Sequence, residues 1–188
     1  LIQEGTIPPC ILVGIGYTGS IELNRFRDYT FPEDDEYEVA NGQGDAFYRF
    51  MTGELIPDIE DKYSVYSTKF TIMGHSLGGF NTLYNMFQND SPFSGYVAVS
   101  ASVWWNDAFL FGEEAQLAAN QSDLPYRVYI GIGGDEPPSM TILNRTIFEQ
   151  LESRNYSELA LAFESFDGAS HSQVPLIGFK NGIKHVLN

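Results

Sequence analysis

The stretch KFTIMGHSLGGF, residues 69–80, decides the fold of this chain. Residues 69–73 form a short, largely apolar run with β-branched side chains, which predicts a buried strand. Phe80, Leu83, Tyr84 and Phe87 then recur at helical spacing and predict an amphipathic helix. The glycine-rich sequence between the two predicts a sharp strand-to-helix turn. Small residues are needed at 74 and 78 because such a turn brings strand and helix backbones close together.

Short apolar runs alternate with longer amphipathic ones along the rest of the chain. Strands are predicted at 10–15, 69–73, 95–100, 127–132 and 159–163, and helices at 44–61, 77–89, 138–155 and 172–187. This alternation predicts parallel βαβ units and a sheet with helices on both faces. Residues 17–41 are polar, with an acidic run at 33–36, and predict a long loop. The expected fold class is α/β, in one domain that spans residues 1–188.

The composition is that of a globular protein, with 43% of the 188 residues hydrophobic and 19% charged. Lys and Arg total 10 against 25 Asp and Glu, and the formal net charge of -15 disfavours nucleic acid and anionic membranes as partners. The single Cys10 has no partner for an internal disulfide, and Cys/His ligand pairs are absent, so we expect no metal site. The expected partner is a small molecule. The compartment, cytoplasmic or periplasmic or secreted, stays open.

Ser76 is the candidate nucleophile, because it lies at the centre of the G-x-S-x-G pattern of residues 74–78. A serine between a strand and a helix is lifted clear of the sheet, where its hydroxyl can attack a substrate. The backbone N–H of Leu77 would then point from the start of the helix at a developing oxyanion. The alternative is a glycine-rich turn without any chemistry.

A serine needs a base, and the chain has three histidines. His75 lies inside the turn, so we expect its side chain to point away from the hydroxyl and to pack. His185 lies in the last predicted helix, three residues from the C-terminus, and is expected at the surface or as a helix cap. His171 follows the last predicted strand, which places it at the carboxyl edge of the sheet. His171 is therefore the candidate base.

The orienting acid is expected after the strand at 127–132, because in this kind of fold the acid lies between serine and histidine in the chain. Asp135 and Glu136 both follow that strand, and only one of two neighbouring side chains can face the imidazole. Asp167 is a third candidate, although its place four residues before His171 suits a role in its own loop. A Ser–His pair with a weak third member is a further alternative.

Six stretches of the chain together resemble one esterase family of α/β-hydrolases. The family includes enterochelin and related siderophore esterases, feruloyl and acetyl-xylan esterases, and S-formylglutathione hydrolases. The matching stretches are 11–17, 25–30, 42–57, 74–79, 100–105 and 171–175, and the siderophore-esterase branch is the most similar. The resemblance implies an ester hydrolase that works without a cofactor. An acyltransferase of the same fold and a non-catalytic member are the alternatives.

The resemblance also implies roles for individual residues. The nucleophile of the family corresponds to Ser76, the base to His171 and the acid to Glu136, which ranks Glu136 narrowly above Asp135. It suggests Trp104 and Trp105 near the substrate pocket, with core packing as the equal alternative. Arg27 and its neighbour Arg25 could pair with an anionic substrate, unless they form structural ion pairs with an acid such as Asp28.

The chain departs from the family pattern at its N-terminus. The family has a strand before the one corresponding to 11–15, and the loop after that earlier strand donates the second oxyanion N–H. Residues 1–5 look like the end of a helix, so the sheet is expected to lack about its first three strands. One of them would lie between the strands at 11–15 and 69–73. Because losing one oxyanion donor typically costs about 100- to 1000-fold in rate, weak activity is expected of this chain alone.

Overall fold

A computed structural model describes residues 1–65 and 70–188. Its centre is a four-stranded parallel sheet with the order β1-β2-β3-β4. The strands are β1 (Phe70–His75), β2 (Phe93–Val99), β3 (Arg127–Gly133) and β4 (Ala160–Phe166). The helices are α1 (Ile21–Tyr29), α2 (Gly44–Phe50), α3 (Ile56–Lys62), α4 (Leu77–Met86), α5 (Trp105–Ala108), α6 (Leu110–Asn120), α7 (Pro138–Ser153) and α8 (Val174–Leu187), and a π-helical turn η1 (Met51–Leu55) joins α2 to α3.

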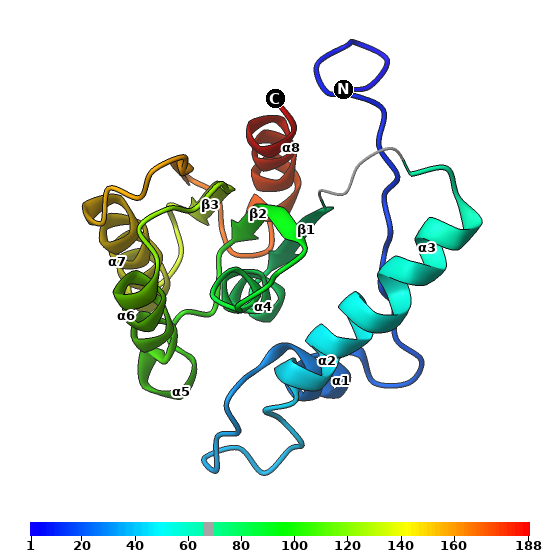
Figure 1. Ribbon diagram of the computed structural model, residues 1–188. Helices are drawn as coiled ribbons and strands as arrows, with labels where there is room; N and C mark the ends of the chain where they lie inside the picture. The colour runs from blue at the N-terminus through cyan, green and yellow to red at the C-terminus, as the bar shows by residue number, and fades with distance from the viewer. Residues whose placement is uncertain (66–69) are drawn as a thin grey trace.

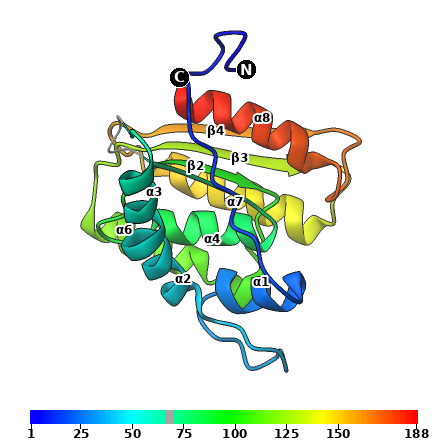
Figure 2. The ribbon, with the colours of Figure 1, turned by 90° about the vertical axis from the view of Figure 1, so that its right-hand side faces the viewer.

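Helices cover both faces of this sheet (Figure 2). The connecting helices α4, α6 and α7 lie on one face, together with α1 and α2, and α8 lies on the other. Neighbouring parallel strands joined by crossovers of one hand place all their connecting helices on the same face. The main core packs between that face and its helices, and a smaller core of five buried residues packs beneath α8, formed by Val97, Val99, Tyr129, Val174 and Val186. The α/β fold class predicted from the sequence is confirmed.

Four of the five predicted strands and all four predicted helices are present, with ends shifted by a few residues. The predicted strand at 69–73 becomes β1, although Lys69 itself lies outside the described residues. The predicted long loop at 17–41 is wrong in part, because it contains helix α1. Ser20 caps this helix by accepting a hydrogen bond at Oγ from the Leu23 N–H, with donor and acceptor 3.3 Å apart.

The strand predicted at 10–15 is not formed. This segment runs past the β1 side of the sheet (Figure 1) without pairing with any strand among the described residues. Its apolar side chains are exposed as a result, and Leu12 keeps 75% of its surface. Residues 1–5, expected to end a helix, form a turn in which the Gly5 N–H donates to the Ile2 carbonyl. An apolar run becomes a strand only where its backbone hydrogen-bonds to a neighbouring strand, and among the described residues the outer edge of β1 stays unpaired because the segment at 10–15 does not join it.

None of the helices in the described part of the chain has the length and apolar character needed to cross a membrane.

Candidate active site

The carboxyl ends of the four strands bring four side chains to one edge of the sheet. Ser76 follows β1, Ser100 follows β2, Glu136 lies in the loop after β3, and His171 lies in the loop after β4. In parallel α/β sheets this edge is where ligands bind, because all the strand-to-helix loops meet there. The serine, acid and histidine selected from the sequence therefore share one edge, as predicted.

Ser76 occupies a strained turn between β1 and α4. Its φ of 61° lies in the left-handed region, which a residue with a side chain rarely adopts. The turn is held by backbone hydrogen bonds, from the Ser76 N–H to the Val99 carbonyl (3.0 Å) and from the Ser102 N–H to the Ser76 carbonyl (3.1 Å). These bonds tie the nucleophile candidate to the end of β2, and the turn presents it at the edge of the sheet.

The turn requires glycine at positions 74 and 79. A Cβ at Gly74 would lie 2.1 Å from the Gly78 carbonyl oxygen, and one at Gly79 would lie 2.9 Å from the Cα of Ala101. A Cβ at Gly78 would meet nothing nearer than the Tyr29 ring, at 3.9 Å. The predicted need for a small residue is thus confirmed at 74. At 78 it is wrong, because the backbone of Gly78, and not its missing side chain, fills the space.

Leu77 is the first residue of α4, so its backbone N–H has no acceptor within the helix. It follows Ser76 directly and lies at the positive end of the helix dipole. The candidate oxyanion donor is therefore placed beside the candidate nucleophile.

Glu136, and not Asp135 or Asp167, faces the imidazole of His171. Its Oε2 lies 2.6 Å from Nδ1 of His171, and its side chain is fully buried. Asp135 and Asp167 are both exposed to solvent. A hydrogen bond from Nδ1–H to the carboxylate leaves Nε2 of His171 free to accept a proton. The geometry thus separates the three acid candidates that the sequence left close together.

The remaining oxygen of the acid, Oε1, accepts two further hydrogen bonds. The Gly133 N–H donates to it at 2.9 Å, and the Ser100 hydroxyl donates at 2.5 Å. Sequence reasoning gave Ser100 no role. A polar residue at the end of the strand next to the nucleophile strand was the available signal.

The hydroxyl of Ser76 lies 3.5 Å from Oγ of Ser102, and no hydrogen bond joins it to His171 in the described part of the chain. In enzymes without a bound substrate, catalytic hydrogen bonds are often long or misaligned and tighten only in the complex. The base–acid pair is therefore formed in this structure, and the nucleophile–base pair is not.

His75 packs against His171, with ring centroids 4.4 Å apart. The predicted packing role of His75 is confirmed, and its partner is the candidate base. Nε2 of His75 is buried without a hydrogen-bond partner. Burial, followed by the nearby charge of His171 when protonated, lowers the pKa of His75 to about 4. His75 is therefore a neutral ring near neutral pH.

The third histidine, His185, lies half-buried at the other end of the sheet, with Nε2 3.0 Å from the Ala160 carbonyl at the start of β4.

The two tryptophans suggested as substrate contacts differ in burial, and the two arginines differ in their hydrogen-bond partners. Trp105 is fully buried, and its ring N–H donates to the Pro32 carbonyl, which fits the packing alternative. Trp104 is half-buried. Arg27 is held by Asp28 through two hydrogen bonds of 2.6 and 2.8 Å, which is the structural ion pair considered as its alternative. Arg25 instead donates to the His75 carbonyl at 3.3 Å, one residue before Ser76.

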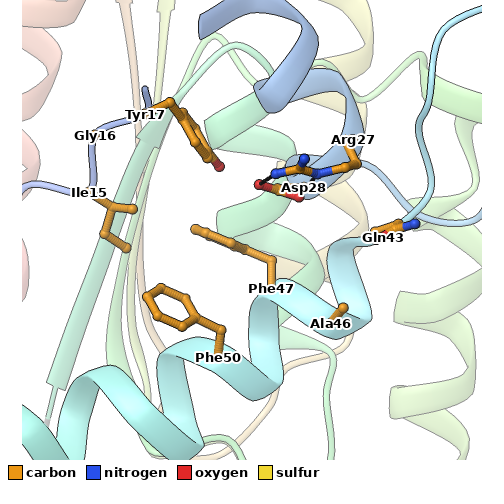
Figure 3. Close-up of a pocket in the computed structure, with 9 residues that line it drawn as sticks. All are labelled: Ile15, Gly16, Tyr17, Arg27, Asp28, Gln43, Ala46, Phe47 and Phe50. Atoms are coloured by element: carbon orange, nitrogen blue, oxygen red, sulfur yellow. Dashed lines mark hydrogen bonds and ion pairs between the residues drawn. The ribbon is translucent and has the colours of Figure 1, made fainter. Parts of the chain in front are cut away.

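A pocket of about 400 Å³ opens between residues 15–17 and helices α1 and α2 (Figure 3). Phe47 and Phe50 form its apolar part, and the Tyr17 hydroxyl points across it toward the Arg27–Asp28 pair. Tyr17 and Phe47 both pack on Tyr29, whose ring would meet a Cβ at Gly78. The Tyr29 ring thus contacts two residues of the pocket and lies near the first turn of α4.

Within residues 1–65 and 70–188, no group of three or more His, Cys, Asp or Glu side chains is arranged to hold a metal ion. Cys10 is exposed and free.

The sequence and the fold of this chain are similar to those of known esterases. The model of the family described as "Putative esterase" matches residues 1–174. The ferri-bacillibactin esterase BesA of Bacillus subtilis is 28% identical over 202 residues, which cover 99% of this chain and 70% of that protein. A siderophore triacetylfusarinine C esterase of Aspergillus fumigatus is 30% identical over 107 residues, covering 55% of this chain and 37% of that protein. The crystal structure of BES protein from Bacillus cereus matches with a TM-score of 0.88 at 26% identity, over 100% of this chain and 73% of that one.

Proposed function

The chain belongs to this esterase family, and from that premise we propose that it hydrolyses carboxylic esters with Ser76 as nucleophile, His171 as base and Glu136 as acid. The observation that carries the proposal is the buried carboxylate of Glu136, 2.6 Å from Nδ1 of His171 at the edge of the sheet that also carries Ser76. A buried acid that orients a histidine beside a strained serine is the arrangement by which serine hydrolases activate their nucleophile.

In this mechanism Nε2 of His171 takes the proton of Ser76 while Oγ attacks the acyl carbon. The carboxylate of Glu136 holds the imidazole in the required tautomer and stabilises the imidazolium that forms. The Leu77 N–H donates to the oxyanion of the tetrahedral intermediate. His171 then gives its proton to the leaving alcohol. In the second half of the reaction water attacks the acyl-enzyme while His171 takes a proton from it, and His171 returns that proton to Oγ of Ser76 as the carboxylic acid product leaves.

A rotation of the Ser76 side chain is needed before the reaction, because its hydroxyl faces Ser102 in the resting structure. Rotation about a single side-chain bond is fast and costs little for an unbranched residue such as serine. The resting contact is therefore compatible with the proposed roles.

Fluorophosphonate labelling tests the proposal directly, because the probe reacts only with an activated serine. We expect one label on the peptide that contains Ser76, no label in Ser76→Ala, and slow labelling in His171→Ala. Ser102→Ala is the matched control, since Ser102 lies beside Ser76 and should not carry the label. A folded wild-type protein that takes up no label, or a label on Ser102, would contradict the proposal.

We further propose siderophore-type esters as the substrate class. The support comes from two relatives, one named as an esterase of ferri-bacillibactin and the other as an esterase of triacetylfusarinine C. Hydrolysis rates of a catecholate trilactone, a hydroxamate ester and p-nitrophenyl acetate, compared at equal concentration, test this class. Product analysis with and without an added alcohol separates hydrolysis from acyl transfer. Faster turnover of p-nitrophenyl acetate than of both siderophore esters would exclude the substrate class and leave the triad intact.

A further inference from the structure

We infer that Ser100 is a positioning residue for the acid of the site, one that fixes the carboxylate of Glu136 for its contact with His171. This inference rests on the proposed function, since it assigns a fourth polar residue to the same group of side chains. The side chain of Ser100 makes no hydrogen bond to Ser76 or His171 in the described part of the chain, and its hydroxyl donates to Glu136 instead.

The first observation is the hydrogen bond itself. The Ser100 hydroxyl donates to Oε1 of Glu136 at 2.5 Å, and both residues are buried, Ser100 completely and Glu136 with 6% of its surface exposed. A hydrogen bond to a buried carboxylate is stronger than one between neutral groups, because one partner carries a full charge in a medium of low polarity.

The second observation is that the chain holds Ser100 in place at a conformational cost. Its φ is 47°, in the left-handed region that disfavours residues with a Cβ. The Ser100 N–H donates to the Gly131 carbonyl of β3 at 2.7 Å, which fixes the strained residue between β2 and β3. A glycine would adopt this conformation without strain, yet the position carries a hydroxyl that reaches the acid.

The third observation is that the two oxygens of the Glu136 carboxylate have different partners. Oε2 faces His171, while Oε1 is held by the Ser100 hydroxyl just after β2 and by the Gly133 N–H at the end of β3. A glutamate has one more rotatable bond than an aspartate, so its carboxylate needs more contacts to stay in one plane. Without the Ser100 hydroxyl, only Gly133 would hold Oε1, and the carboxylate could turn away from Nδ1 of His171.

The test compares Ser100→Gly and Ser100→Ala with wild type, alone and in a Glu136→Ala background. Both variants remove the hydroxyl, but Ser100→Gly also relieves the backbone strain, so we expect it to melt at a higher temperature than Ser100→Ala. Loss of one hydrogen bond to a charged group predicts a fall of about 10- to 100-fold in kcat for p-nitrophenyl acetate and in the rate of fluorophosphonate labelling. KM should stay the same, because Ser100 is completely buried and a substrate does not touch it.

The double variants give the readout that a purely structural residue would not change. If Ser100 acts through Glu136, Ser100→Gly causes no further loss once Glu136 is alanine, because the atom it positions is gone. An equal loss in both backgrounds, or wild-type rates in Ser100→Gly, overturns the inference. So does a loss of activity in Ser100→Ala and Ser100→Gly that only follows the unfolded fraction. Absence of labelling in the wild type would instead count against the proposed function.

Discussion

The backbone around Ser76 leaves no space for a side chain at position 74. A Cβ there would lie 2.1 Å from the Gly78 carbonyl oxygen, an overlap that only a backbone shift can relieve. We therefore expect Gly74→Ala to lower the free energy of unfolding by about 3 kcal/mol or more, above the usual range for an overpacked core position. Gly78→Ala is the matched control, since the nearest atom to its Cβ would be 3.9 Å away. Urea unfolding of both variants measures the difference in the free energy of unfolding. Equal stability of the two variants would contradict the close approach of the backbone at positions 74 and 78.

His75 gives the stability of the protein a dependence on pH. Burial and the neighbouring His171 lower its pKa from 6.5 to about 4, so the unfolded chain binds a proton that the folded chain rejects. Stability should therefore fall as the pH drops from about 6.5 to about 4, by about 1–2 kcal/mol from this group, because solvent screens the exposed part of the ring. Above about pH 7.5 the group is neutral in both states and contributes no slope. Thermal melting from pH 4 to 7 should show a smaller slope in His75→Gln, and an identical slope would refute the assignment.

At the scale of the elements, a buried carboxylate joins α6 to α7. Glu114 of α6 has no exposed side-chain surface, and it accepts hydrogen bonds from Arg154, Gln150 and Tyr156. Burial alone would raise the pKa of Glu114, but these hydrogen bonds, with the charge of Arg154, outweigh it and lower the pKa. The network thus stabilises the fold above the ordinary pKa of a glutamate, and this contribution is lost as the pH falls below it.

Removing the cation should therefore be costly. We expect Arg154→Met to reduce the free energy of unfolding by about 3–5 kcal/mol at neutral pH, because it leaves a buried charge without its partner. The deficit should shrink in acid, where Glu114 can take up a proton. Arg145→Met is the control on α7, since Arg145 is exposed and lies over the Phe163 ring, a contact worth about 0.5–1 kcal/mol. A similar loss in both variants would mean that Glu114 is not held as described.

The elements that the sequence predicted correctly are those whose signals are local. The helix at 138–153 shows its period within its own residues, and β2 and β3 are apolar because both of their faces are covered. The segment at 11–15 has the same composition, but a strand also needs a partner, and partners are not written in the segment itself. Helix α1 was missed for the opposite reason. Its capping Ser20 is a local signal, which the polar character of the surrounding residues concealed.

Some residues of the candidate site could be predicted from local sequence signals, and others only from the three-dimensional structure. The strand-to-helix context singled out Ser76, and its position after the last strand singled out His171, since parallel strands bring such loops together. The resemblance to the esterase family ranked Glu136 only narrowly above Asp135, because the choice depends on which of two adjacent side chains turns inward, and the three-dimensional structure displays that. Ser100 was not selected, because a polar residue at the end of β2 is a weak signal and its contact with Glu136 is seen only in three dimensions.

At the scale of the whole molecule, the net charge of -15 predicts a negative potential around the protein. Such a field repels anions over a distance set by the ionic strength, about 30 Å at 0.01 M salt and about 10 Å at 0.1 M. Arg25, which donates to the His75 carbonyl beside the nucleophile, is a local positive charge within this field. The repulsion by the net charge acts over a longer distance than the attraction by Arg25. Added salt screens the longer-range repulsion more, so the salt dependence can distinguish the two effects.

A pair of esters that differ only in charge makes this separation measurable. If the overall field controls access, kcat/KM for anionic p-nitrophenyl hemisuccinate should rise about 3- to 10-fold between 0.01 and 0.15 M NaCl, because salt screens the repulsion. Neutral p-nitrophenyl acetate should change little over the same range. A fall in kcat/KM for the anionic ester would show that a nearby cation dominates, and Arg25→Met should then abolish that dependence. Arg27→Met is the control for this second outcome, since Asp28 already neutralises Arg27. The direction of the salt effect therefore decides whether the site selects its substrates by the charge of the whole molecule or by one arginine beside Ser76.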